Sequence, residues 1–488
     1  MEKGKSRIMI VGKSKIGTML IYLYLVLPFL IFSMTWLRWY YALLMTIAIL
    51  VGCYFLYRHA PELPVFKWRK EVVFLALIIL GLWVYLAGIG GYVTQNVDHA
   101  YRNGIFRILV ESKWPVEKLI ESAGESSERG LAYYIGFWLP AGAAGKIFGL
   151  EIGYLGQILW AFCGVVMVYY LICCVLKKAD LWPLLLFIAF GGLDLIAYYV
   201  TGNPTYNLEN WVHLEQWTPL QFSSFTTQLF WVYNQAIPAW IVLLLLYLQE
   251  DNKSMICIWA FTMMLSTIPF VGMMPFMAYF AIRNIRCREI KGIRQNIVAL
   301  VKSVLSYENI LLGFLVGILS FLFLFGNTSI AETATKKTSY APEVFVMQYI
   351  MTILFEVAIY FGVIYKYQKK NPLFYISFVW FLICPLIKVG SGEDFCMRAP
   401  IPAQMILFLM VAQSIIIAHQ EKDRRFLIII GVLIAISSLT GIHEVNRTIS
   451  NTMRGNFERQ YIDEETIMTG GNFSGDISNS IFYRYFAE

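Results

Sequence analysis

Residues 152–176 read IGYLGQILWAFCGVVMVYYLICCVL and contain no charged side chain. A helix needs about 20 apolar residues to cross the hydrocarbon core of a bilayer. An unpaired backbone group is costly in that core, so a spanning segment must be a helix, which pairs its own backbone groups, or part of a closed barrel. Barrel strands alternate apolar and polar residues, and this stretch does not. It therefore predicts a transmembrane helix.

Similar stretches recur along the whole chain of 488 residues, of which 58% are hydrophobic and 15% are charged. Soluble domains carry about a quarter charged residues, so this composition favours a membrane protein. We expect an all-α fold, a polytopic transmembrane bundle of about 11–13 spans. The candidate spans are residues 18–36, 40–57, 72–92, 152–176, 182–200, 236–250, 255–270, 272–282, 309–326, 344–365, 372–388, 402–419 and 425–441.

Residues 255–284 differ from the other apolar stretches because Pro269, Gly272 and Pro275 interrupt them. Broken helices persist in a membrane only where protein or a wet cavity covers the freed backbone. The segment is therefore predicted to be a re-entrant hairpin or two short helices. A single span would also turn the basic cluster at residues 283–294 outward.

The charge distribution predicts the orientation of the bundle. With the N-terminus in the cytoplasm, the short cytoplasmic segments hold 24 of the 39 Lys and Arg residues. This is the positive-inside pattern of membrane proteins. The net charge of +7 is thus explained by topology, and we expect the lipid bilayer, and no nucleic acid, as a partner.

This topology divides the chain into four parts. They are the N-terminal spans with a basic cytoplasmic segment (1–92), an outer acidic loop (93–151), the transmembrane bundle (152–441) and an outer tail (442–488). In the acidic loop, the apolar spacing from Asp98 to Ile120 predicts helices lying in the membrane interface, broken at Pro115. Residues 131–149 predict a second interfacial or partly re-entrant segment.

Asp98 follows the third span and precedes several basic residues, among them Arg102 and Arg107. A carboxylate at the membrane surface, followed by cations at phosphate level, fits a site for a phosphorylated lipid. The alternative is that Asp98 caps a helix and that the cations bind anionic headgroups.

Residues 201–235 contain neither Lys nor Arg, but they interleave neutral hydrogen-bonding side chains with aromatic rings. Such a mixture suits a sugar, which has hydroxyl groups on its rim and an apolar face. The candidate sugar or acceptor ligands here are Glu215, Gln228, Asn234 and Gln235. An interfacial aromatic belt is one alternative, and a metal site from Glu209, His213 and Glu215 is another.

Residues 389–401 place Glu393, Asp394 and Arg398 between two spans. Charges so close to hydrocarbon are expensive and usually have a partner. Arg398 could bind a phosphate, because the guanidinium fork matches phosphate geometry. Alternatively, an Asp394–Arg398 ion pair holds the loop.

Together these features resemble the C-type (GT-C) superfamily of integral-membrane glycosyltransferases, bacterial type. The resemblance rests on the segment DHAYRNGIFRILVESKWPV, which begins at Asp98, on APIPA directly after Arg398, and on the closing FYRYFAE. Most of the chain shares the gross organisation, whereas the motifs cover a few dozen residues. One departure is that His99 follows Asp98 where many members carry a second acid.

The resemblance implies an inverting transfer from a polyprenyl-phosphate sugar to a glycan or lipid-linked acceptor at the outer face of the plasma (inner) membrane. It assigns Asp98 as the general base, or as a ligand of a divalent cation such as Mg or Mn. Asp394 would then be the second catalytic acid. The donor phosphate would meet Arg398, Arg102 and Arg107, and His99 would join the sugar-binding residues.

Two alternatives remain from the sequence. A surface-polysaccharide polymerase or ligase would gather several arginines in a large outer loop, which residues 201–235 lack. A transporter or flippase of lipid-linked saccharides would carry charges near the membrane midplane. Only Glu356 lies in the middle of a predicted span.

Overall fold

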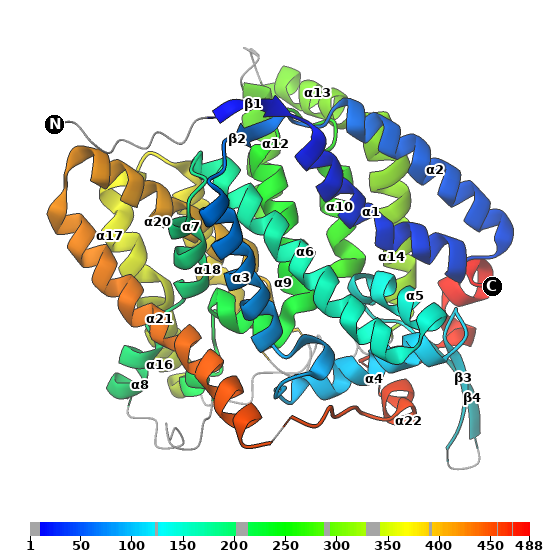
Figure 1. Cartoon of the computed structure of the whole chain (residues 1–488). Helices are drawn as coiled ribbons and strands as arrows, with labels where there is room; N and C mark the ends of the chain where they lie inside the picture. Colours follow the sequence, from blue (N-terminus) through cyan, green and yellow to red (C-terminus); the bar gives the residue numbers. More distant parts are fainter. Residues whose placement is uncertain are drawn as a thin grey trace.

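The computed structural model describes residues 10–122, 125–201, 213–286, 293–327, 342–389, 393–455, 457–470 and 472–488. Long helices run between two ends of a bundle (Figure 1). We call them the β1 end and the α4 end. The β1 end carries β1 (Ile10–Ser14), β2 (Leu63–Phe66) and α13 (Ile293–Val304). The α4 end carries α4 (Asp98–Glu111), β3 (Glu117–Ser122), β4 (Glu125–Leu131), α22 (Glu464–Thr469) and β5 (Ser474–Asp476).

The helices of the first half of the chain are α1 (Ile16–Trp36), α2 (Trp39–Arg58), α3 (Lys70–Leu86), α5 (Leu139–Phe148), α6 (Leu150–Leu176), α7 (Leu181–Ala189), α8 (Asp194–Thr201) and α9 (Phe225–Leu248). Those of the second half are α10 (Met255–Leu265), α11 (Thr267–Gly272), α12 (Met274–Arg286), the π-helix η5 (Asn309–Phe314), α14 (Leu315–Phe325), α16 (Pro342–Thr352), η6 (Ile353–Ala358), α17 (Ile359–Gln368), α18 (Pro372–Ile383), α19 (Asp394–Arg398), α20 (Ile401–Glu421) and α21 (Arg424–Met453). Short 3-10 or π turns, η1 (Ile89–Gly91), η2 (Gly136–Trp138), η4 (Leu214–Trp217), η7 (Cys384–Leu386), η8 (Ile477–Asn479) and η9 (Phe482–Phe486), complete the described helices.

Eight of the described helices are long and apolar enough to cross a membrane, and a ninth follows if the bent pair Gln295–Val304 and Asn309–Phe325 is one span. The chain is thus a multi-pass membrane protein. Fewer helices reach this length than the 11–13 spans predicted. The remaining predicted spans correspond to the shorter helices α3, α10, α12 and α18.

The long helices differ in how much of their surface faces the outside. The apolar part of α9 is 89% buried, whereas those of α2 and α21 are 28% buried. Helix α9 therefore lies at the centre of the bundle. Large leucines such as Leu43 and Leu44 on α2 point outward, and extensive exposed apolar surface of this kind marks contact with lipid.

The segment 255–284 folds back on itself, as its Pro and Gly residues predict. Near the end of α12, Arg283 donates hydrogen bonds to the carbonyls of Tyr247 and Gln249, at 3.1 and 2.6 Å. Its neighbour Asn284 donates to the Asp251 carbonyl at 3.1 Å. Because these partners precede α10, both ends of the segment meet at the β1 end, and α11 forms the inner part of the hairpin.

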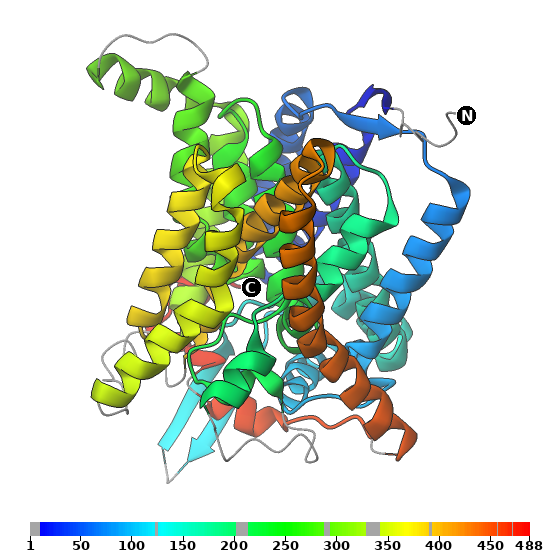
Figure 2. The ribbon, with the colours of Figure 1, turned by 90° about the vertical axis from the view of Figure 1, so that its left-hand side faces the viewer.

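The acidic loop is only partly helical. Helix α4 confirms a helix after Asp98, but the helix predicted beyond Pro115 is wrong, because residues 117–131 form the β3–β4 hairpin. Strand β5 pairs with β4 and extends this sheet. The fold is thus not purely α-helical. Figure 2 shows the cyan hairpin at the opposite end of the molecule from the N-terminus.

The tail after α21 covers the α4 end. Helix α21 itself continues to Met453, beyond the predicted boundary at residue 441. Farther on, the Ile462 N–H donates to the Ala100 carbonyl at 3.0 Å, and the Tyr483 hydroxyl donates to the Leu131 carbonyl at 2.6 Å. The tail and the acidic loop therefore form one layer.

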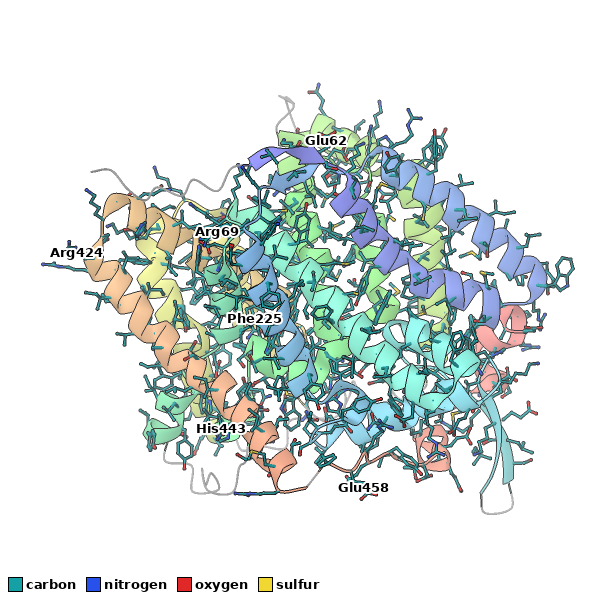
Figure 3. The ribbon with its side chains drawn as sticks, in the orientation of Figure 1. Glu62, Arg69, Phe225, Arg424, His443 and Glu458 are labelled. Atoms are coloured by element: carbon teal, nitrogen blue, oxygen red, sulfur yellow. The ribbon has the colours of Figure 1, made fainter. Side chains whose placement is uncertain are left out.

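Charged side chains lie at both ends of the bundle. In Figure 3, Glu62, Arg69 and Arg424 lie nearer the β1 end, whereas His443 and Glu458 lie nearer the α4 end.

Candidate functional site

A pocket of about 390 Å³ opens at the α4 end between α4, α11, α14, α19 and the tail. Its charged side chains are Asp98, Arg102, Asp394 and Arg398. Four of the residues singled out from the sequence thus meet in one cavity, although the outermost two, Asp98 and Arg398, are 300 positions apart in the chain. The rest of the lining is aromatic, amide, hydroxyl or aliphatic: Tyr101, Ile105, Ala132, Tyr133, Tyr134, Thr267, Ile268, Val271, Leu324, Asn327, Val389, Phe395, Asn472 and Phe473.

Two ion pairs of the same design flank the pocket. On α4, Arg102 Nη2 lies 3.1 Å from Asp98 Oδ2; on α19, Arg398 Nη2 lies 3.0 Å from Asp394 Oδ1. Both pairs are spaced i, i+4, so partners share a helix face. The Arg side chains are 9% and 14% exposed and the carboxylates 39% and 42%. The guanidinium groups are therefore built into the wall, and the carboxylates reach into open space.

Each guanidinium keeps unused hydrogen-bonding capacity. Arg102 Nη1 and Arg398 Nε are buried and have no hydrogen-bond partner. A buried donor without an acceptor costs free energy until a ligand supplies one. An oxyanion with several acceptor oxygens would satisfy both groups.

The first turn of α4 decides between the two interpretations of Asp98. The side chain that accepts a backbone N–H there is that of Asn96, whose Oδ1 binds the Asp98 N–H at 3.1 Å. The Asp98 carboxylate contacts Arg102 instead. Helix capping therefore does not account for Asp98. In α19, by contrast, the ion pair expected as the alternative interpretation is present.

Two adjacent tyrosines, which the sequence analysis did not single out, line the pocket beside Arg398. The Tyr134 hydroxyl accepts hydrogen bonds from Arg398 Nη1 at 3.4 Å and from Gln235 Nε2 at 3.1 Å, and it also contacts the Tyr133 hydroxyl. Burial raises the pKa of both tyrosines, so they remain neutral hydroxyl groups. No sequence spacing distinguishes them from the chain's other interfacial aromatics.

Gln235 approaches the pocket through Tyr134, but it is not among the residues that line it. Asn234 is buried, and its side-chain amide has no hydrogen-bond partner. Gln228 lies in the bundle core, where it donates to Gln404 Oε1 at 2.6 Å and accepts from Trp240 at 2.9 Å. None of these three residues is therefore placed to contact a ligand in the pocket directly.

His99 and Arg107 share α4 with Asp98 but point elsewhere. His99 Nε2 binds the Phe230 carbonyl at 2.9 Å and its Nδ1 lies 3.2 Å from Gln95. Burial lowers the pKa of His99 to about 3, so the ring is neutral. Arg107 pairs with Glu111 at 2.8 Å and stacks over Tyr461. Its guanidinium is thus already engaged outside the pocket.

Glu215 belongs to a second polar cluster, buried between α8, α9, α21 and η6. Its Oε1 accepts the Ser224 N–H at 2.7 Å, and its Oε2 lies 3.4 Å from His213. His213 also pairs with Glu444 at 2.8 Å. The pKa of His213 is about 10, because the carboxylates of Glu444 and Glu215 outweigh burial, which alone would lower it. The remaining member of the alternative metal site, Glu209, lies outside the described residues.

Two further acids lie beside this cluster. Asp194 accepts hydrogen bonds from Trp217 at 3.0 Å and Thr440 at 2.8 Å. Glu356 is 4% exposed, and its Oε1 has no hydrogen-bond partner. The structure therefore buries more acids inside the bundle than the single mid-span Glu356 expected from sequence.

No protein-family model matches the chain, and neither a curated protein nor a solved structure matches it.

Proposed function

We propose that the chain is an integral-membrane glycosyltransferase of the GT-C type, which moves a sugar from a polyprenyl-phosphate donor to a cell-envelope acceptor. One observation carries this proposal. Two buried guanidinium groups, each with an unpartnered N–H, face a pocket whose other walls are largely apolar or aromatic. A polyprenyl phosphate has the matching parts, an oxyanion beside a hydrocarbon chain.

In the proposed reaction, an acceptor hydroxyl attacks the anomeric carbon as Asp98 removes its proton. The bond between that carbon and the phosphate oxygen breaks, and polyprenyl phosphate leaves with the bonding electrons. Attack from the face opposite the leaving group inverts the anomeric centre. Arg398 and Arg102 stabilise the charge that develops on the phosphate, which is the main electrostatic need of such a step.

The remaining assignments have less support. Asp394 forms an ion pair with Arg398, so its proposed role is to hold that guanidinium in position. Gln235 is connected to the charged residues of the pocket only through its hydrogen bond to the Tyr134 hydroxyl. For Arg107, His99, Glu215, Gln228 and Asn234, binding of donor or acceptor remains a prediction from the sequence alone.

A divalent cation such as Mg or Mn stays a prediction from the resemblance. Magnesium is usually bound by one or two carboxylates together with waters and substrate phosphates. Asp98 and Asp394, which each pair with a guanidinium in the structure, would be those carboxylates. The proposed steps name only the chain's own residues.

The orientation belongs to the same proposal. We infer from the positive-inside pattern of the sequence that the β1 end faces the cytoplasm and that the α4 end, with the pocket, faces the outside of a plasma membrane. This places the transfer on the outer face, where a cell-envelope acceptor is available.

Incubation of the purified full chain with a panel of polyprenyl-phosphate sugars and an envelope glycan acceptor tests the function directly. We expect one donor to lose its sugar in step with formation of polyprenyl phosphate. Binding of donors without any transfer across the panel would favour a transporter instead.

A transporter or flippase of lipid-linked saccharides is the second candidate, and the buried acids favour it. Ionisable groups inside a membrane protein often mark ion or proton pathways. If this is the function, proteoliposomes should move a lipid-linked saccharide between leaflets in a way that depends on Glu356 and Asp194. A polymerase or ligase of surface polysaccharide has no comparable observation in its favour.

A further inference from the structure

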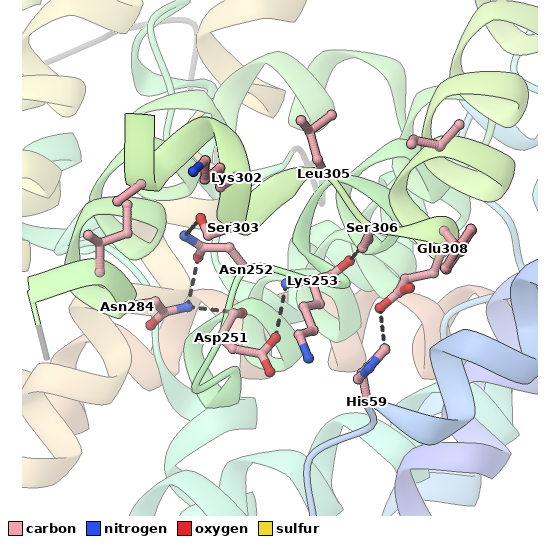
Figure 4. Close-up of a pocket in the computed structure, with 14 residues that line it drawn as sticks. His59, Asp251, Asn252, Lys253, Asn284, Lys302, Ser303, Leu305, Ser306 and Glu308 are labelled. Carbon is pink, nitrogen blue, oxygen red and sulfur yellow. Dashed lines mark hydrogen bonds and ion pairs between the residues drawn. The ribbon is translucent and has the colours of Figure 1, made fainter. Parts of the chain in front are cut away.

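A second cavity, of about 680 Å³, is lined in part by α13 at the β1 end, opposite to α4 and the pocket in Figure 1. Figure 4 shows this cavity in close-up. It shares Leu305 and Ile310 with a third hollow of about 460 Å³ between α10 and the η5–α14 helix. The two hollows therefore adjoin at these two residues, and we call them together the β1-end cleft. It belongs neither to the pocket nor to the proposed reaction.

The deeper part of the β1-end cleft is apolar. Along η5 and α14, Ile310, Phe314, Ile318 and Phe321 form a stripe at helical spacing, and these side chains are exposed. The polar side chain there, Asn309, is already engaged, since it donates to the Asn252 and Val304 carbonyls and accepts the Cys257 N–H. This part of the cleft fits a hydrocarbon chain.

The outer part is charged, with two cations and two acids. Lys253 and Lys302 are exposed, and neither has an ion pair among the described residues. Glu308 is fully buried and its Oε1 lies 2.7 Å from His59 Nδ1, as Figure 4 shows. Asp251 lies next to Lys253 on the connection between α9 and α10. An occupant of this part meets both signs of charge.

Glu308 also retains an unsatisfied atom. Its Oε2 is buried and has no hydrogen-bond partner. A carboxylate oxygen in that state is stabilised by a ligand that brings an N–H donor. Helix α13, which contributes Lys302, is bent by 78° from the following span. This bend is the geometry of a helix lying at the level of lipid headgroups.

We propose that the β1-end cleft binds one diacyl phospholipid whose headgroup carries a primary ammonium and no charge beyond that and its phosphate, that is, a phosphoethanolamine lipid. The ammonium donates to Glu308 Oε2 and Asp251, the phosphate lies between Lys253 and Lys302, and one acyl chain occupies the apolar part. A phosphocholine head has no N–H to donate. A phosphoglycerol head adds negative charge beside two acids without offering a cation.

The test uses the full chain in nanodiscs of equal parts phosphatidylethanolamine, phosphatidylcholine and phosphatidylglycerol, followed by stepwise detergent release and native mass spectrometry. We expect phosphatidylethanolamine to be retained about tenfold over phosphatidylcholine, the effect of one charge-assisted hydrogen bond. Replacing the exposed Lys302 by Gln should abolish most of this retention. Replacing Lys370, an exposed lysine two residues after the end of α17, by Gln should leave it unchanged. Equal retention of the three lipids, or preference for phosphatidylglycerol, would overturn the proposal.

A second variant tests the acyl-chain part without touching a charge. Gly317 lines the groove, and a Cβ there would meet only the Ala260 Cβ, at an ordinary contact distance of 3.9 Å. Gly317→Leu therefore adds an apolar side chain to the groove without a clash at its Cβ. We expect retained lipid to fall to background with an unchanged thermal unfolding midpoint. Wild-type retention in this variant would refute the assignment of the chain to this groove.

Discussion

Replacing Asp98 by Asn is the sharpest perturbation of the proposed reaction, because it removes the base while keeping the size of the side chain. The new amide oxygen can still accept the Arg102 hydrogen bond, which is 3.1 Å long in the wild type. With 39% of the Asp98 side chain exposed, loss of the ion pair should cost about 0–1 kcal/mol of folding stability. A general base contributes roughly 10²–10⁴-fold to a rate, so we expect kcat to fall by that factor.

The assay measures sugar transfer from the active polyprenyl-phosphate donor by the purified variant, alongside its thermal unfolding. Glu111→Gln is the matched control, since Glu111 pairs with Arg107 on the same helix at the same i, i+4 spacing but outside the pocket. The control should transfer at the wild-type rate. If Asp98→Asn also transfers at that rate, Asp98 is not the base and the proposed chemistry fails.

Three further predictions concern the guanidinium groups and the buried His213. Arg398→Lys should raise the KM for the donor about tenfold or more with little change for the acceptor, because an ammonium cannot replace the bidentate fork; equal losses for both substrates would remove the phosphate assignment. Arg107→Gln should leave the donor KM within about twofold of the wild type, since the Arg107 guanidinium pairs with Glu111 outside the pocket. A large increase in this KM would show that Arg107 does bind the donor. His213 has a pKa raised to about 10 in the folded chain, so its ion pairs stabilise the fold fully below about pH 6.5, the unfolded value, and lose this effect as the pH rises toward 10. The thermal unfolding midpoint of the wild type should therefore fall more across that pH window than the midpoint of His213→Gln. Parallel plots of midpoint against pH for the two proteins would contradict the stabilising role of the His213 ion pairs.

Much of the architecture could be predicted because its causes are local. Residues 152–176 are long and apolar enough to specify α6 without reference to the rest of the chain. Pro269 and Gly272 interrupt an apolar stretch, and the hairpin follows. The meeting of Asp98 with Arg398 was predicted from the resemblance and from their common side of the membrane, since nothing near either residue in the sequence encodes the contact.

The parts that could not be predicted depend on distant partners. Residues 117–122 contain apolar residues at positions that also fit a helix, and they become a strand because residues 125–131 and 474–476 supply the neighbouring strands. Likewise, Glu215 resembles a sugar ligand in a loop without Lys or Arg. In the fold, residues 213–224 turn into the bundle, where Ser224 and His213 contact the carboxylate.

The tail contributes to the pocket at a point that matters for how the protein is made. Asn472 and Phe473 line the cavity, and they follow every membrane helix in the sequence. The Phe473 carbonyl accepts the Ala132 N–H at 2.8 Å and the Asn472 carbonyl accepts Asn327 Nδ2 at 2.7 Å, so these residues fasten early segments to late ones. A nascent chain that has inserted the helices up to α21 still has an unfinished cavity, and the proposed reaction becomes possible only after residues 472 and 473 have packed against Asn327 and Ala132.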